Sequence, residues 1–137
     1  MTSGLVVART SLTRRLSLWA PVVVYMGLIF LVSGLPSAPL PEGVSDKSGH
    51  VLAYLVLGVL SVRAVGGGLG RRVTISIALG ALAISVGYGA FDEWHQGLVP
   101  GRFPDMTDWY ADAIGSMIGL GACWAWSMIR ALGRRPQ

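Results

Sequence analysis

The sequence has little charge and almost no cysteine. Only 13 % of its 137 residues are charged and 53 % are hydrophobic, with a mean hydropathy of +0.58. A soluble domain normally carries about 25 % charged residues. The single cysteine, Cys123, excludes an intramolecular disulfide and a thiolate zinc cluster, so we expect it to serve in packing. This composition favours a membrane protein that forms one domain over residues 1–137.

Several chemical motifs are also missing. The chain has no HExxH motif, no EF-hand spacing and no recognisable serine-nucleophile motif. The GGGLG stretch at residues 66–70 lacks the lysine and the following Ser or Thr of a Walker motif, so a flexible turn is the better interpretation. We therefore expect no cofactor, with a divalent metal held by oxygen and imidazole ligands as the open alternative.

Four apolar stretches dominate the chain, and each is long enough to cross a hydrocarbon core, which needs about 17 to 25 helical residues. They cover approximately residues 16–35, 47–65, 73–91 and 108–129. The sequence thus predicts an all-α polytopic membrane protein with four transmembrane helices in a bundle. The first apolar stretch is longer than the core of a signal peptide, so we expect it to be retained as a span.

The charges separate along this four-span arrangement. All of the eleven Lys and Arg residues except Lys47 and Arg102 fall on one side, and the seven acids lie at or near the other. Because short cytoplasmic loops are enriched in cations, both termini should be cytoplasmic and the acidic side should face outside. This rule explains the basic side without a nucleic-acid partner, and the expected partner is the lipid bilayer.

Polar residues near the outer ends share helix faces when each residue advances 100°. At the head of the second span, one face carries Asp46, Lys47, His50 and Tyr54. An acid inside a membrane bundle usually faces the bundle interior and marks a functional site. These residues therefore predict a site at the outer end.

The other two faces come from the third and fourth spans. Asp108 and Asp112 lie within an arc of about 60° with Gly115 and Gly119, which are small enough to mark a packed helix seam. If the third helix continues outward, it adds Asp92, Glu93 and Gln96 at the same depth.

Helix capping is the competing interpretation for part of this set. Asp46 and Asp105 lie at or just before helix N-termini, where a carboxylate accepts from free N–H groups, and Asp108 could act as a first-turn acid. Asp92 and Glu93 instead lie at a C-terminal end, where the helix dipole disfavours anions. Capping therefore does not explain the third-span acids.

The motifs in order resemble the VanZ-like family of small bacterial membrane proteins. They are DKxxH with a following tyrosine (residues 46–54), DExxQ (92–96), PGR (100–102), Asp108 and the ADAIG run (111–115). The resemblance covers roughly residues 46–120. It implies a small bacterial membrane protein, and with the cation distribution we expect a multi-pass protein of the inner membrane with its polar site outside. The family is named for a member linked to resistance against teicoplanin-type antibiotics, which bind cell-wall precursors outside the membrane.

Two classes of function fit these residues. One is an enzyme acting on a lipid-linked or cell-envelope substrate. Its acid–base candidates are His50, Asp92 and Glu93, with Asp112 orienting them. Its candidates for substrate binding are Asp46, Lys47, Tyr54, Gln96, Arg102 and Asp108, with the two cations holding an anionic group. The other class is a non-catalytic protein whose polar cluster recognises a headgroup, shields the envelope or fixes the bundle.

Overall fold

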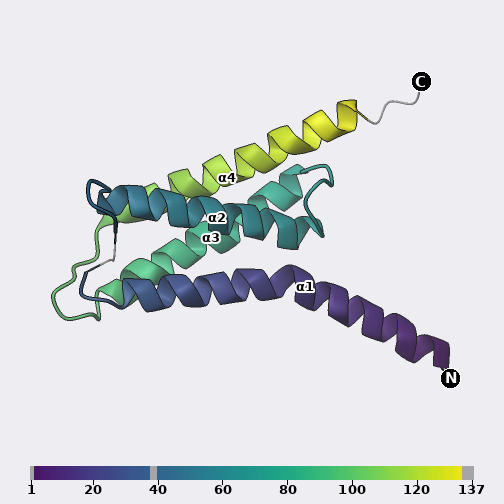
Figure 1. The fold of residues 1–137 in the computed structure, drawn as a ribbon, viewed down its shortest axis with the longest axis horizontal. Coiled ribbons are helices and arrows are strands. Elements are labelled where there is room, and N and C mark those ends of the chain that lie inside the picture. Colours follow the sequence, from purple (N-terminus) through teal and green to yellow (C-terminus); the bar gives the residue numbers. More distant parts are fainter. Residues whose placement is uncertain (1, 38–39, 134–137) are drawn as a thin grey trace.

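The computed structural model describes residues 2–37 and 40–133, which form four helices in chain order (Figure 1). Their bounds are α1 Thr2–Ser33, α2 Asp46–Gly66, α3 Ile75–Gln96 and α4 Met106–Leu132. No strand occurs in these two described ranges, so the all-α prediction is confirmed. The α3 helix continues through Gln96, so Asp92, Glu93 and Gln96 belong to one helix, as the predicted polar face assumed.

The helices run up and down, so the connections alternate between two ends (Figure 1). The α1–α2 and α3–α4 loops lie at one end, called here the loop end. The α2–α3 turn lies at the opposite end, the turn end, together with the N-terminal turns of α1 and the C-terminal turns of α4 (Figure 1). Ser45, Thr74 and Asp105 cap the N-termini of α2, α3 and α4 by accepting from backbone N–H groups. Asp46 is therefore a first-turn acid rather than the N-cap.

Three helical stretches are long and apolar enough to cross a membrane: Ser11–Ser33, Asp46–Gly66 and Ile75–Gln96. They present large apolar side chains on the surface, among them Leu31 at 66 % and Leu79 at 64 % exposure, as a lipid-facing helix does. Helix α4 has 27 residues but is not among the three. Its glycines, tryptophans and Asp112 lower its hydropathy, so its span stays a prediction.

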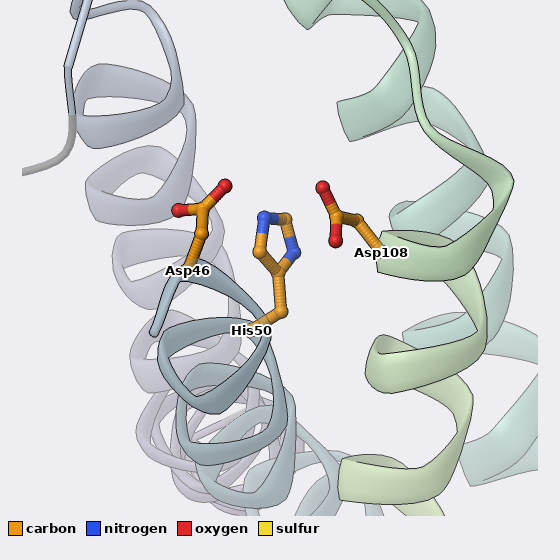
Figure 2. Close-up of side chains that lie close together, drawn as sticks. All are labelled: Asp46, His50 and Asp108. Atoms are coloured by element: carbon orange, nitrogen blue, oxygen red, sulfur yellow. The ribbon is translucent and has the colours of Figure 1, made fainter. Parts of the chain in front are cut away.

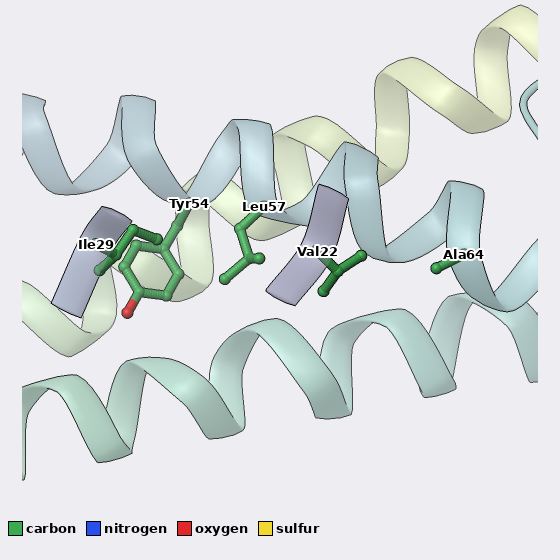
Figure 3. Close-up of a cluster of buried hydrophobic side chains, with 5 residues drawn as sticks. All are labelled: Val22, Ile29, Tyr54, Leu57 and Ala64. Carbon is green, nitrogen blue, oxygen red and sulfur yellow. The ribbon is translucent and has the colours of Figure 1, made fainter. Parts of the chain in front are cut away.

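The bundle core lies between α1, α2 and α3. Figure 3 shows its buried apolar residues, which are Val22, Ile29, Tyr54, Leu57 and Ala64. A second cluster joins α2, α3 and α4 and contains Cys123, which is 8 % exposed and packs as expected. Between helices in lipid, such clusters stabilise through close van der Waals packing rather than through removal of apolar surface from water.

The seam between α2 and α4 depends on glycine. A Cβ on Gly115 would collide with the carbonyl oxygen of Val51, and a Cβ on Gly119 with that of Leu55. Across the same seam, Gly58 of α2 leaves room for Ser116, whose carbonyl oxygen would lie 2.8 Å from an added Cβ. These contacts confirm the predicted small-residue seam.

Pro21 interrupts α1, and α2 satisfies the carbonyl that it leaves free. Proline has no N–H, so the carbonyl of Ser17, four residues earlier, loses its helical partner. The guanidinium of Arg63 donates to Ser17 O at 3.0 Å and to Leu18 O at 3.2 Å. These bonds join α1 to α2 at the turn end, in the region where α1 bends (Figure 1).

Candidate functional site

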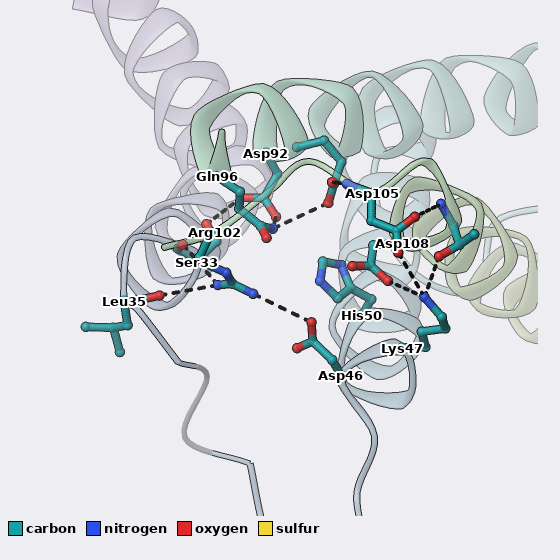
Figure 4. A network of polar contacts seen from close by, with 12 residues as sticks. Ser33, Leu35, Asp46, Lys47, His50, Asp92, Gln96, Arg102, Asp105 and Asp108 are labelled. Atoms are coloured by element: carbon teal, nitrogen blue, oxygen red, sulfur yellow. Dashed lines mark hydrogen bonds and ion pairs between the residues drawn. The ribbon is translucent and has the colours of Figure 1, made fainter. Parts of the chain in front are cut away.

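The polar residues predicted from three helices meet at the loop end (Figure 4). This end holds the first turns of α2 and α4 and the last turn of α3, and α1 contributes Ser33 (Figure 4). The buried acids are Asp92 (1 % exposed), Glu93 (7 %), Asp108 (8 %) and Asp112 (0 %). Burying carboxylates at this depth is costly unless hydrogen bonds or cations compensate, so their partners matter.

His50 and Asp112 form a close pair. The His50 Nδ1 lies 2.8 Å from Asp112 Oδ1. An ionised carboxylate can only accept, so Nδ1–H donates to it, and in the neutral imidazole the lone pair is then on Nε2. Helix α3 approaches through Gly89, where an added Cβ would lie 2.8 Å from Asp112 Oδ2. That oxygen is buried and has no hydrogen-bond partner among the described residues. Asp112 therefore orients the imidazole and sets its tautomer.

The two acids at the end of α3 are held by neighbouring segments. Ser33 Oγ donates to Asp92 Oδ1 at 2.5 Å, which joins α1 to α3. Gln96 Nε2 donates to Asp92 Oδ2 at 3.2 Å and to Glu93 Oε1 at 3.4 Å. The backbone N–H of Asp105 donates to Glu93 Oε2 at 2.9 Å. These donors offset the unfavourable helix dipole at the C-terminal end of α3.

Lys47 joins α2 to the start of α4. Its Nζ lies 3.3 Å from Asp105 Oδ2 and 3.1 Å from Asp108 Oδ1, and it also donates to Thr107 Oγ1. Hydrogen bonds from Thr107, and then the Lys47 ammonium, lower the pKa of Asp105 below its ordinary value. Asp105 thus caps the N-terminus of α4, as the capping interpretation predicted.

Arg102 joins the α3–α4 loop to α1 and α2. Its Nη1 donates to Ser33 O at 3.1 Å and to Leu35 O at 3.4 Å, and its Nη2 lies 3.6 Å from Asp46 Oδ2. Both predicted anion-binding cations are thus paired with acids inside the protein. Their role in holding a substrate anion stays a prediction. A bound anion would have to share each cation with the acids that already pair with it.

A cavity of about 280 Å³ opens between α1 and α2 beside this cluster. Its walls are mainly apolar and include Leu28, Ile29, Val32, Leu40 and Ala53. Four of the predicted site residues line it: Asp46, His50, Tyr54 and Asp92. The other six are not among its lining residues. Asp112, Gln96 and Arg102 bond directly to His50, Asp92 and Asp46. Glu93, Lys47 and Asp108 join the network only through other residues. The cavity therefore combines an apolar wall with a polar end.

Tyr54 and Ser33 contribute to the polar end of the cavity in different ways. Tyr54 is fully buried, and its hydroxyl has no hydrogen-bond partner among the described residues. Ser33 lines the cavity while it donates to Asp92. Ser33 could not be selected from sequence, because it lies at the end of an apolar stretch with no polar periodicity. Only its contact with α3 shows its place in the site.

Among the residues that the structure describes, two groups of side chains are close enough to hold a metal ion. Within each group the ligand atoms lie within 4.8 Å of one another. The groups are Asp46, His50 and Asp108, whose arrangement Figure 2 shows, and His50, Glu93 and Asp112. Both groups depend on His50, and Glu93 already accepts two hydrogen bonds. Each Glu93 oxygen accepts one of these bonds, so a metal would use a second lone pair of the carboxylate.

Comparison with known proteins identifies a family but no individual relative. No curated protein and no solved structure matches the chain. A family model described as VanZ/LLP1 matches residues 13–129, which include all ten predicted site residues. Because this match covers most of the chain, the protein belongs to the VanZ/LLP1 family.

Proposed function

We propose that the chain crosses the bacterial inner membrane four times, with both termini in the cytoplasm and the loop end outside. The cation distribution supports this orientation, since nine of the eleven cations belong to the turn end or the terminal segments in the four-span arrangement. The up-and-down order of the helices fits it as well (Figure 1). The 27 residues of α4 are enough for a fourth span.

In this membrane, the protein acts as an acid–base enzyme on a lipid-linked substrate of the cell envelope. The observation that carries this proposal is the His50–Asp112 pair beside the cavity. Asp112 is fully buried and fixes the imidazole through Nδ1, while His50 itself lines an apolar-walled space. A base whose tautomer is set by a buried carboxylate can take a proton through Nε2.

The remaining acids supply complementary roles. Asp92 lines the cavity and shares the Gln96 amide with Glu93, so Asp92 can exchange a proton with the substrate and Glu93 can tune it. The family is not known for cofactors, and the proposal uses none.

The cavity indicates the class of substrate. Its wall from α1 and α2 suits an acyl or isoprenoid chain, and its polar end suits the headgroup where the bond changes. A lipid-linked cell-wall precursor has both parts. A link to teicoplanin-type resistance would follow if the protein alters the precursor that the antibiotic binds.

A non-catalytic function is the second candidate, and the pairing of both loop-end cations and of most carboxylate oxygens within the protein favours it. Lys47 has three partners, Arg102 has three, and both oxygens of Asp92 and of Glu93 accept hydrogen bonds. Such a network can fix a bundle that only recognises a headgroup.

Conversion of envelope lipids distinguishes the two functions. Purified wild-type protein and Glu93→Gln are incubated with lipid-linked cell-wall precursors, and the lipids are identified by mass spectrometry. We expect the wild type to form a product and the variant to form it about 10²-fold more slowly. Glu42→Gln, which removes an exposed acid from the α1–α2 loop, is the matched control. Identical lipid profiles for folded wild type and Glu93→Gln would contradict the enzymatic proposal.

A further inference from the structure

A second cavity lies at the turn end, away from the acidic cluster. It measures about 320 Å³ and lies between α1, the end of α2 and the α2–α3 turn. Three arginines line it, Arg14 and Arg15 from α1 and Arg71 from the turn, and Leu18 and Val65 provide apolar surface. Residues far apart in the sequence thus place three cations around one space.

Two of these guanidinium groups converge on Gly67. Arg14 Nη2 donates to Gly67 O at 3.2 Å. An added Cβ on Gly67 would lie 3.2 Å from Arg71 Nη1 and 3.7 Å from Arg14 Nη2. Gly67 has a φ of +71°, the left-handed conformation that ends α2 and allows the turn to bring Arg71 back toward α1. Two like charges are therefore held close together.

No carboxylate neutralises these cations within the described part of the chain. Each ion pair found there involves Lys47, His50 or Arg102 with an acid of the loop end. All seven acids of the sequence belong to the α1–α2 loop or to the helix turns near the loop end. An anion between the arginines would remove their mutual repulsion and accept from their paired N–H groups.

We propose that this arginine-lined cavity binds the phosphate headgroup of an anionic phospholipid. The cavity adjoins membrane-spanning stretches of α1 and α2, so its depth matches the headgroup layer. Leu18 and Val65 continue from the arginines along these helices and offer apolar contact to the start of an acyl chain. Basic pockets between helices at the cytoplasmic face bind anionic headgroups in this way. The inference does not depend on the proposed enzyme activity.

The test measures stabilisation of the full chain in detergent by added phosphatidylglycerol. The buried Cys123 reacts with a thiol-specific dye only on unfolding, so it reports the thermal midpoint. We expect phosphatidylglycerol to raise the wild-type midpoint. Phosphatidylcholine and inorganic phosphate should raise it much less. In Arg71→Gln the apparent affinity for phosphatidylglycerol should fall on the order of fivefold, because one arginine near the headgroup is lost.

Arg72→Gln is the matched control, since this neighbouring exposed arginine does not line the cavity. It should keep the wild-type affinity. If Arg71→Gln does not fold, Arg15→Gln repeats the measurement from α1. Equal losses in Arg72→Gln and the cavity variants would overturn the proposal in favour of diffuse charge attraction. An equal response to phosphatidylcholine would also overturn it, and an equal response to inorganic phosphate would replace the lipid with a free anion.

Discussion

Replacing His50 by glutamine is expected to lower the rate of substrate conversion by about 10²- to 10⁴-fold, the range for a positioned acid or base. Glutamine can still bond to Asp112 Oδ1 through its amide, but it offers no titratable nitrogen to the cavity. The fold should therefore persist while proton transfer stops. Initial rates with a lipid-linked precursor measure the effect, and helical content by circular dichroism checks the fold.

His95→Gln provides a matched control for this change. His95 lies at the same loop end, on the last turn of α3, but its ring stacks on Phe30 with a centroid distance of 3.9 Å and does not line the cavity between α1 and α2. The same chemical change there should leave the rate of conversion near that of the wild type. Equal rates for the wild type and His50→Gln would remove His50 from the reaction.

Replacing Gly115 by alanine is expected to destabilise the bundle by about 1 to 3 kcal/mol, and leucine should cost more. The added Cβ meets the carbonyl oxygen of Val51, which is backbone and cannot rotate away. Helices α2 and α4 must therefore separate. Asp112 lies about one turn earlier on α4, so the separation should also weaken its 2.8 Å contact with His50. Thermal unfolding followed through Cys123 measures the loss.

Gly121→Ala is the control on the same helix. An added Cβ at Gly121 meets no atom within 4 Å. Alanine there should be neutral or stabilise α4 by up to about 1 kcal/mol, because glycine in a helix interior is the less favourable residue. If Gly115→Ala and Gly121→Ala had the same thermal midpoint, the close α2–α4 seam would be wrong.

The helices and the seam could be predicted because both depend on local patterns. Apolar length located the four helices, and the spacing of Gly115 and Gly119 indicated the face of α4 that packs closely on α2. Gly87 of α3 does not lie in a comparable close seam. An added Cβ there meets nothing within 4 Å. The small size of a residue alone therefore does not predict which face of a helix is covered.

The convergence of the polar residues could also be predicted, but their pairing could not. Helix periodicity placed His50 and Asp112 at one depth. It did not show that they bond to each other, or that Lys47 bonds to α4. Such contacts depend on helix rotation and separation, which are set by packing across the whole bundle. The cavity and Ser33 were missed for the same reason, because both require the position of α1 relative to α2 and α3.

In the proposed reaction, the cavity between α1 and α2 brings a lipid to His50, so blocking this cavity should stop the reaction. Ala53 lines the cavity next to Tyr54, so Ala53→Phe places a ring in the space without removing any group of the His50–Asp112 pair. Ala78→Phe is the matched control, because Ala78 lines a different cavity of about 310 Å³ between α3 and α4. We predict that Ala53→Phe folds but loses conversion of the lipid-linked precursor, whereas Ala78→Phe retains it. Undiminished conversion by Ala53→Phe would contradict the account.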